Sequence, residues 1–243
     1  MTDPVYRTIL LFDIEQFGSR DDVEQAYLRR VLYDVVDATL VASGVEETAS
    51  LRADRGDSVM ELIDAQVSVP ALVKTLLTET PSQLHNKNRL LASSARIRLR
   101  IVLSSGYVAI DELNGWVGSD LNHAVRLLNA EVLRAALKQR DGDCVLCVSD
   151  GVYDGVVRHG PLGVRPDDFH RVTVDTKEGP TVAWLHGAPT QAAAPGVPGS
   201  HAPDATAGAP VSHTSIAGDQ YGISGGTVNG DLRFDRPGRG DRG

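Results

Sequence analysis

The chain has 243 residues, of which 42% are hydrophobic, so it can bury a sizeable core. Its formal net charge of -8 argues against a nucleic-acid-binding surface, because such a surface needs clustered Lys and Arg to neutralise phosphates. No run of about 18 consecutive apolar residues occurs, so we expect no membrane span. The N-terminal segment MTDPVYRTILLFDIEQF lacks the features of a signal peptide, so we expect a cytoplasmic protein.

The apolar patterns predict alternating strands and helices in the first half of the chain. In order, we expect a strand over 7–12, a helix over 21–43, strands over 50–53 and 58–63, and a helix over 70–78. Gly44 is a natural C-cap for the first helix, and Pro70 suits the first turn of the second. The apolar stripe expected of the first helix comprises Val23, Tyr27, Leu28, Val31, Leu32, Val35, Val36 and Ala38.

The second half continues this alternation. We expect a strand with one solvent-exposed face over 96–103, its continuation over 106–110 after a turn, and a helix over 120–137. A strand over 143–148, a short helix over 150–157, and strands around 172–174 and 182–185 follow. The order strand, helix, two strands, helix, strand is the ferredoxin-like unit, here with extra strands and helices. We therefore expect an α+β fold with an antiparallel sheet covered by helices on one face.

Three regions of different composition divide the chain. Residues 1–188 contain all the periodic apolar patterns, so we expect them to form one folded domain. Residues 189–213 are almost wholly Ala, Pro, Gly, Ser, Thr and His, which predicts a disordered linker. Residues 214–243 hold a short β-prone, Gly-punctuated segment and a charged end.

Two carboxylates stand where strands end. Asp13 follows the first apolar strand, and Asp57 lies in the DRGD turn between the next two strands. Such a pair can hold a hard divalent cation, because Mg²⁺ is usually bound by one or two carboxylates plus substrate phosphates. The exposed amides in the loop to Gly18 can also cradle phosphates. Taken alone, an Asp in a turn is most often only a solvated turn residue.

Two further features carry basic groups. Asn122 and Arg126 lie four residues apart, so they project from one helix face and suit negative charge developing on a phosphate and a ribose. Lys177 lies in a Lys-Glu-Gly turn between the last two strands. An Asn/Arg pair on a helix is usually just surface, so it is the order of the four features along the chain that points to a site.

The two cysteines, Cys144 and Cys147, have a spacing that invites a redox or metal-binding interpretation. The run around them is continuously apolar and predicts a buried strand, where residues three apart point to opposite faces. We therefore interpret both as small buried hydrophobic residues.

These motifs resemble those of the class III adenylate and guanylate cyclases over nearly all of residues 8–186. FDIEQFGS is similar to the metal-binding loop of that family, RGDSVMEL to its second metal-binding hairpin, and GSDLNHAVRLL to its transition-state helix. RIRLRIVLSSGYV and VSDGVYDGV extend the resemblance. It implies a class III cyclase-like fold that converts an NTP to a 3′,5′-cyclic nucleotide and pyrophosphate.

The resemblance also assigns roles near the two carboxylates. It implies that Asp13, Ile14 and Asp57 bind two Mg²⁺ or Mn²⁺ ions per active site. Phe17 and Gly18 then belong to the substrate-binding loop.

For the rest of the site, the resemblance implies that Asn122 orients the ribose, Arg126 stabilises the pentavalent phosphorus, and Lys177 holds the β- and γ-phosphates. In the family, these groups and the metal-binding residues come from different protomers. The implied assembly is therefore a homodimer with composite active sites.

Two positions depart from the family pattern. Ala53 and Gly115 stand where the purine cyclases carry a base-reading Lys and a base-reading Asp or Cys. Neither offers a side-chain hydrogen bond to a purine edge. The departure fits the bacterial pyrimidine cyclases that make cyclic CMP or UMP as an anti-phage alarm, and it fits equally a relaxed or decayed pocket.

The segment SIAGDQYGISGGTVNGDLRF resembles the amyloid signalling motifs of bacterial immunity proteins. A short β-prone segment of low net charge can stack in register on copies of itself or on an effector with a matching motif. The alternative is an inert tail. For the whole chain, the alternative to an enzyme is a non-catalytic cyclase-like dimer that acts as a scaffold or nucleotide sensor.

Overall fold

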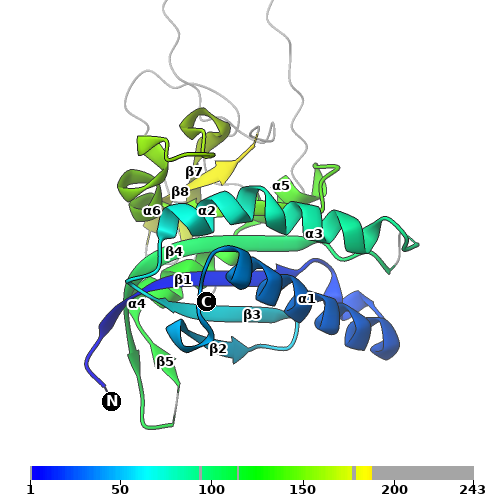
Figure 1. Cartoon of the computed structure of the whole chain (residues 1–243), viewed down its shortest axis with the longest axis horizontal. Helices are drawn as coiled ribbons and strands as arrows, with labels where there is room; N and C mark the ends of the chain where they lie inside the picture. Colours follow the sequence, from blue (N-terminus) through cyan, green and yellow to red (C-terminus); the bar gives the residue numbers. More distant parts are fainter. Residues whose placement is uncertain (1, 93–94, 114, 177–178, 188–243) are drawn as a thin grey trace, which may run out of the picture. The chain divides into compact units, whose positions relative to one another are not determined.

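A central β-sheet organises the part of the chain that the computed structural model describes, residues 2–92, 95–113, 115–176 and 179–187 (Figure 1). Its strands are β1 (Val5–Ile14), β2 (Ser50–Asp54), β3 (Ser58–Asp64), β4 (Leu99–Ile110), β6 (Cys144–Ser149), β7 (Phe169–Thr176) and β8 (Gly179–His186). They lie in the order β2-β3-β1-β4-β6-β8-β7, and the short β5 (Trp116–Val117) forms a hairpin with β4. Lys177 and the expected linker and terminal motif at 189–243 lie outside the described residues.

The ferredoxin-like core expected from the sequence is confirmed. Strands β2, β3, β1 and β4 lie side by side, and each adjacent pair is antiparallel. The expectation of a wholly antiparallel sheet was wrong at one place, because β6 pairs parallel to β4, with Leu99 opposite Cys144. The two helices between β4 and β6 return the chain to the end of the sheet where β4 began, which is what a parallel neighbour requires.

Helices cover both faces of the sheet, so the expectation of a single covered face was wrong. One face packs on α1 (Asp22–Ala42), α2 (Val69–Leu77), α3 (Glu79–Asn88) and α6 (Asp150–Gly155), and the other on α4 (Ser119–Leu128) and α5 (Glu131–Lys138). Figure 1 shows α1, α2 and α3 together over the first of these faces. We call these the α1–α3 face and the α4–α5 face. Among the described helices, none is both long and apolar enough to cross a membrane.

The sequence of strand β1 reflects burial on both faces of the sheet. Leu10 and Phe12 point into the core of the α1–α3 face, whereas Ile9 and Leu11 point into the core of the α4–α5 face. All four side chains are fully buried. A strand buried on both faces is a continuous apolar run rather than an alternating one, which is the pattern of ILLF.

Helix α1 has the expected limits but a different buried stripe. Asp21 caps it by accepting a hydrogen bond from the amide of Glu24 at 2.8 Å. Val23 and Tyr27, expected in the stripe, are exposed, Val23 by 80%. At 3.6 residues per turn these two residues point away from the line of buried side chains, because that line is centred on Leu28, Leu32, Val35 and Thr39.

Several element limits also differ from the expected ones. β4 runs without a turn through Ser104 and Gly106, and α3, which the patterns did not predict, follows α2 directly. The single helix expected over 120–137 is two helices, because Ala130 adopts an extended backbone between α4 and α5. The expected short helix over 150–157 ends as α6 at Gly155.

The cysteines behave as predicted. Both are free thiols, and Cys144 packs toward the α1–α3 core whereas Cys147 is buried in the α4–α5 core. Burial raises the pKa of each thiol to about 12. Two thiols on opposite faces of a sheet cannot share a disulfide or a metal ion.

Candidate functional site

The structure brings Asp13 and Asp57 to the same edge of the sheet. Asp13 is the second-to-last residue of β1 and pairs with Ser58, the first residue of β3, which directly follows Asp57. The amide of Ile14 donates a hydrogen bond to the main-chain oxygen of Asp57, with an N–O distance of 3.0 Å. Burial is the main cause of the raised pKa of Asp13, and the nearby charge of Asp57 adds to it. The two predicted metal-binding carboxylates are therefore neighbours.

Asp13 is held by a residue that sequence analysis did not single out. Arg100 stands directly opposite Asp13 on β4, and both its Nε, at 3.0 Å, and its Nη2 donate to Asp13 Oδ2. Both side chains are nearly buried, with exposed fractions of 12% for Arg100 and 11% for Asp13. Arg100 lies in the segment RIRLRIVL, where the alternation of charged and apolar residues suggested that the arginines face solvent. Instead, Arg98 and Arg100 pair with Glu15 and Asp13.

The electrostatic balance at Asp13 favours a further cation. Burial, which is the largest effect, raises the pKa of Asp13 above its ordinary value, and Asp57 adds to this rise. Arg100 opposes it through its hydrogen bond and its charge, but the net direction remains upward. Because Arg100 does not fully compensate the buried carboxylate, a divalent cation beside Asp13 and Asp57 would relieve the remaining cost.

The loop after β1 has the conformation of an anion cradle. Gln16 takes the left-handed backbone conformation, with φ of 56°, and a short 3-10 helix over Phe17–Ser19 follows. The first amides of such a turn have no acceptor inside it, so they can bind a phosphate. Gly18 faces open space, because a Cβ atom there would meet nothing within 4 Å. Phe17 packs its side chain against the α1–α3 core, which anchors the loop.

These residues fit a hard cation that is bound jointly with phosphates. Asp13 and Asp57 supply carboxylate oxygens, and Ile14, whose side chain is a hydrocarbon packed in the core, can contribute only its main-chain oxygen. Within the described ranges, no group of three or more His, Cys, Asp or Glu side chains lies close enough to hold a metal ion. Two carboxylates and one main-chain oxygen, from Asp13, Asp57 and Ile14, suit Mg²⁺ or Mn²⁺, because these ions take oxygen ligands and keep positions for substrate phosphates.

Asn122 and Arg126 lie elsewhere in the same chain. Asp120, at the start of α4, accepts a hydrogen bond from the amide of Tyr107 at 2.7 Å. Tyr107 is seven residues along β4 from Arg100, which corresponds to roughly 23 Å of strand at about 3.3 Å per residue. The first turn of α4, with an exposed Asn122, therefore begins far from Asp13. Within one chain, Asn122 is therefore not a neighbour of the carboxylate pair.

The two base-reading positions are also separated. Ala53 pairs with Met60 on β3 and packs against the α4–α5 core. Gly115 lies in the β4–β5 hairpin loop, where its amide donates to Asp111 Oδ1 at 2.6 Å. A Cβ atom at Gly115 would come within 2.6 Å of Asp111 Oδ2. A larger residue at 115 would therefore have to displace the Asp111 carboxylate, which accepts hydrogen bonds from the amides of Leu113 and Gly115.

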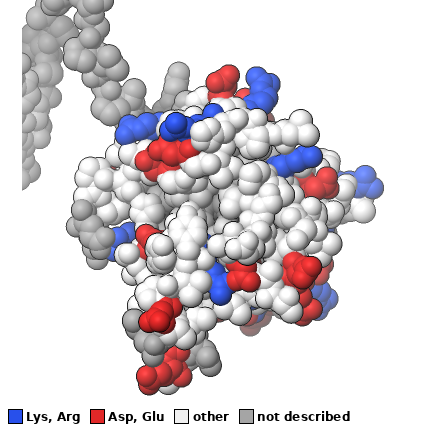
Figure 2. Space-filling model, turned by 60° about the vertical axis from the view of Figure 1, so that its left-hand side comes forward, with Lys and Arg blue, Asp and Glu red and all other residues white. Residues whose placement is uncertain are grey.

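An exposed apolar surface surrounds the start of β1 and the β4–β5 hairpin. Tyr6 and Tyr107 make an edge-to-face contact with ring centroids 5.4 Å apart, and they are 45% and 59% exposed. Val5 and Val117 beside them are about half exposed. Figure 2, which turns this side of the molecule forward, shows charged side chains mainly around the margin of a broad uncharged area. Surfaces of this kind mark interaction sites.

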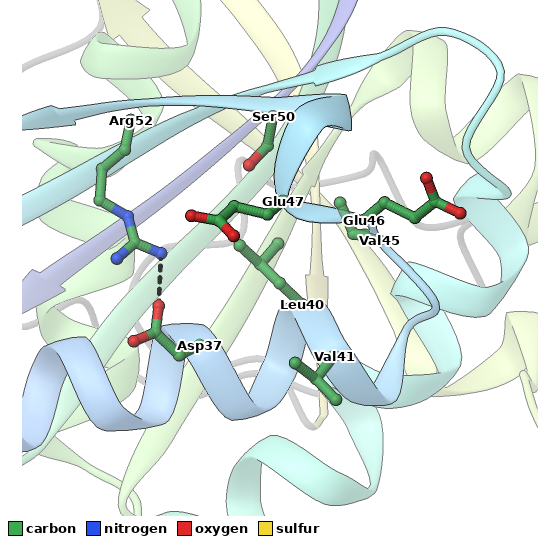
Figure 3. Close-up of a pocket in the computed structure, with 8 residues that line it drawn as sticks. All are labelled: Asp37, Leu40, Val41, Val45, Glu46, Glu47, Ser50 and Arg52. Carbon is green, nitrogen blue, oxygen red and sulfur yellow. Dashed lines mark hydrogen bonds and ion pairs between the residues drawn. The ribbon is translucent and has the colours of Figure 1, made fainter.

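A cavity of about 560 Å³ lies on the opposite face of the sheet from Asp13, between α1 and β2 (Figure 3). Arg52 lines it and pairs with Asp37 at 2.7 Å and with the fully buried Glu61. Since Arg52 and Glu61 project toward α1, whereas Asp13 projects toward α5, this cavity is separate from the two carboxylates.

Comparison with solved structures places this arrangement in a known fold. The chain matches an adenylate/guanylate cyclase/hydrolase from Silicibacter pomeroyi with a TM-score of 0.56 at 15% identity, covering 78% of this chain and all (100%) of the other. A bacterial light-regulated adenylyl cyclase gives a TM-score of 0.54 at 18% identity, over 78% of this chain and 94% of that one. The guanylyl cyclase Cya2 gives 0.53 at 16% identity, over 78% and 95%.

No protein-family model matches the sequence, and no curated protein matches it. The likeness is therefore one of structure, and at these identities it establishes the fold. The chain has the fold of the class III adenylyl and guanylyl cyclase catalytic domains, as expected from its motifs.

Proposed function

We propose that this protein is a metal-dependent nucleotidyl cyclase that converts an NTP to a 3′,5′-cyclic nucleotide and pyrophosphate. The observation that carries the proposal is the adjacency of Asp13 and Asp57, joined through the hydrogen bond from Ile14 to Asp57, at the edge of a sheet with the cyclase fold. The amides of Phe17 and Gly18, which are compatible with phosphate binding, lie in the loop that follows β1.

Each residue has a defined task in this reaction. Asp13 and Asp57 hold two Mg²⁺ or Mn²⁺ ions, and Arg100 keeps the Asp13 carboxylate in place. When bound there, such ions would supply a lower pKa for the 3′-hydroxyl and would neutralise charge on the phosphates. The 3′-oxygen then bonds to the α-phosphorus, its proton passes to solvent, and pyrophosphate leaves. Arg126 stabilises the charge on the α-phosphate.

The remaining substrate contacts follow from the resemblance. Asn122 orients the ribose, the amides of Phe17 and Gly18 bind phosphate oxygens, and Lys177, outside the described residues, holds the β- and γ-phosphates. Because Asn122 and Asp13 lie far apart in one chain, these contacts need a second copy. We propose a homodimer in which each site takes Asp13 and Asp57 from one protomer and Asn122 and Arg126 from its partner. The exposed apolar surface around Tyr6 and Tyr107 supports such an association.

We further propose that the substrate is a pyrimidine nucleotide, UTP or CTP, and that its cyclic product acts as an anti-phage signal. The support is chemical. Ala53 carries only a methyl group and Gly115 has no side chain, so neither position can hydrogen-bond a purine edge. The terminal segment 214–243 would then connect the enzyme to an effector with a matching motif.

The decisive experiment is to incubate the purified full-length protein with each of the four NTPs and Mn²⁺ and to identify products by mass spectrometry. We expect a 3′,5′-cyclic nucleotide and an equal amount of pyrophosphate from the wild type, and neither from an Asp57→Ala variant. A folded dimer that binds NTP and Mn²⁺ but forms no cyclic product would establish the alternative, a non-catalytic nucleotide sensor or scaffold.

A further inference from the structure

Helix α1 contacts the turn that carries Asp57 mainly through Arg29, and Tyr33 of the same helix also hydrogen-bonds Asp54. Arg29 donates to Asp54 from Nη1 to Oδ1 at 3.1 Å and from Nη2 to Oδ2 at 2.6 Å, which is a two-point contact between guanidinium and carboxylate. Nη1 of Arg29 also donates to the main-chain oxygen of Gly56. Arg29 therefore contacts the turn both at its first residue and at the residue before Asp57.

Asp54 connects these contacts to the backbone of the turn. Its Oδ1 accepts a hydrogen bond from the amide of Gly56 at 2.7 Å, while the same carboxylate receives Arg29. Gly56 has a φ of 89°, in the region that favours glycine. Four hydrogen bonds that involve Asp54 or Arg29 thus restrain the peptide that leads into Asp57.

Asp57 depends on these bonds more than Asp13 does. Asp13 is fixed within β1 by pairing on both sides and by Arg100 on β4. Asp57 lies before the first residue of β3, in a turn whose preceding residues are exposed. Two main-chain hydrogen bonds also restrain this turn, from the amide of Ile14 to Asp57 and from the amide of Arg55 to Ser58, and the clamp from α1 adds the side-chain contacts.

We propose that Arg29 and Asp54 are positioning residues that hold Asp57 for divalent-cation binding. The inference rests on the proposed function, because it concerns the cation that Asp13 and Asp57 share. Groups that orient metal-binding residues from outside typically change affinity for the metal by about 10- to 100-fold when they are removed.

The clamp can be tested without confusing it with folding. The side chains of Arg29 and Asp54 are 34% and 44% exposed, and an ion pair this exposed contributes little to global stability. Arg30, the next residue of α1, is exposed and offers a matched control. The Arg29→Ala and Arg30→Ala variants remove the same kind of charge from the same helix, but only the first removes the clamp.

The experiment measures Mn²⁺ binding to the full-length protein by electron paramagnetic resonance of the free ion, with melting temperatures in parallel. We expect Arg29→Ala to weaken binding by about tenfold while Arg30→Ala binds as the wild type does. Asp54→Asn keeps an acceptor for the amide of Gly56 but loses the charge, so it should weaken binding less. The variant that combines Arg29→Ala with Asp54→Asn should bind no more weakly than Arg29→Ala alone, because both changes disrupt the same ion pair.

The outcomes separate the inference from the proposed function. If the wild type binds Mn²⁺, Asp57→Ala does not, and Arg29→Ala binds like the wild type, the clamp has no role and the inference is overturned alone. Equal losses in Arg29→Ala and Arg30→Ala would overturn it as well, since charge rather than contact would then explain them. If Asp57→Ala binds Mn²⁺ as the wild type does, both the metal assignment and the inference fail.

Discussion

Arg100 and Asp13 face each other across β4 and β1, and both guanidinium donors of the contact meet the same carboxylate oxygen. The pair lies at the end of the sheet where the candidate cation site is. Arg100 therefore compensates part of the cost of burying Asp13, and it fixes the direction in which the carboxylate points.

This pairing separates the consequences of removing the two carboxylates. We expect Asp13→Ala and Asp57→Ala to lose cyclase activity by at least about 100-fold, since each removes a direct metal-binding group. Asp13→Ala should also lower the free energy of unfolding by on the order of 3 kcal/mol, because it leaves the nearly buried charge of Arg100 unpaired. Asp57→Ala should not, because Asp57 lies in a turn. Product assays and urea unfolding measure the two effects, and full activity in Asp57→Ala would refute the metal assignment.

The separation of Asn122 from Asp13 predicts complementation between inactive variants. If the site is composite, mixing Asp57→Ala with Arg126→Ala regenerates one intact site in each mixed dimer. After subunit exchange, about one quarter of the wild-type activity should return, since half of the dimers are mixed and each has one of its two sites intact. Subunit exchange is checked with differently tagged chains. Two variants that exchange subunits and still give no product would indicate a site contained within one chain.

The residues at the two expected base-reading positions predict that purine nucleotides are not the preferred substrates. Ala53 carries only a methyl group, and Gly115 has no side chain, so neither position can hydrogen-bond a purine edge. We therefore expect UTP or CTP to give a higher kcat/KM than ATP and GTP, measured in competition with Mn²⁺ present. Selective conversion of ATP would mean that another residue contacts the base.

The thiols predict a clear pH dependence of chemical modification. Burial raises the pKa of Cys144 and Cys147 to about 12, and only the thiolate reacts with alkylating reagents. At pH 8 on the order of one thiol in 10⁴ is ionised, so the folded protein should resist iodoacetamide, and labelling should accelerate as the pH rises toward 12. Both cysteines should react rapidly at pH 8 in guanidinium chloride. Rapid labelling of the folded protein at pH 8, followed by mass spectrometry, would contradict the buried placement.

The terminal region predicts a separable function. The last strand along the chain, β8, ends at His186, so a chain that ends at Ala188 retains every described helix and strand. We expect this shortened chain to keep its melting temperature and its cyclase activity. A peptide of residues 215–234 should self-associate and bind thioflavin T. A peptide that remains monomeric at high concentration would instead support an inert tail.

Local signals in the sequence were enough to predict several helices, strands and turns of this protein. The limits of α1 follow from the cap at Asp21 and from Gly44, which has a φ of 72° just past the end of the helix. The continuous apolar run before Asp13 predicts β1, and the Gly56-Asp57 turn predicts the hairpin between β2 and β3. These signals act over a few residues, through backbone conformation and the period of burial, so they can be interpreted without knowing what packs where.

Other features depended on contacts between distant segments. Arg100 and Asp13 are 87 residues apart, and their meeting depends on the register between β4 and β1, so the arginines of β4 suggested a solvent-exposed face. The covering of both sheet faces and the separation of Asn122 from Asp13 likewise depend on the path from β4 through α4 and α5 to β6. Periodicity shows that a side chain is buried or charged. The partner of that side chain depends on the register between strands and on the sheet face that each helix covers. Both are determined by the packing of the whole domain.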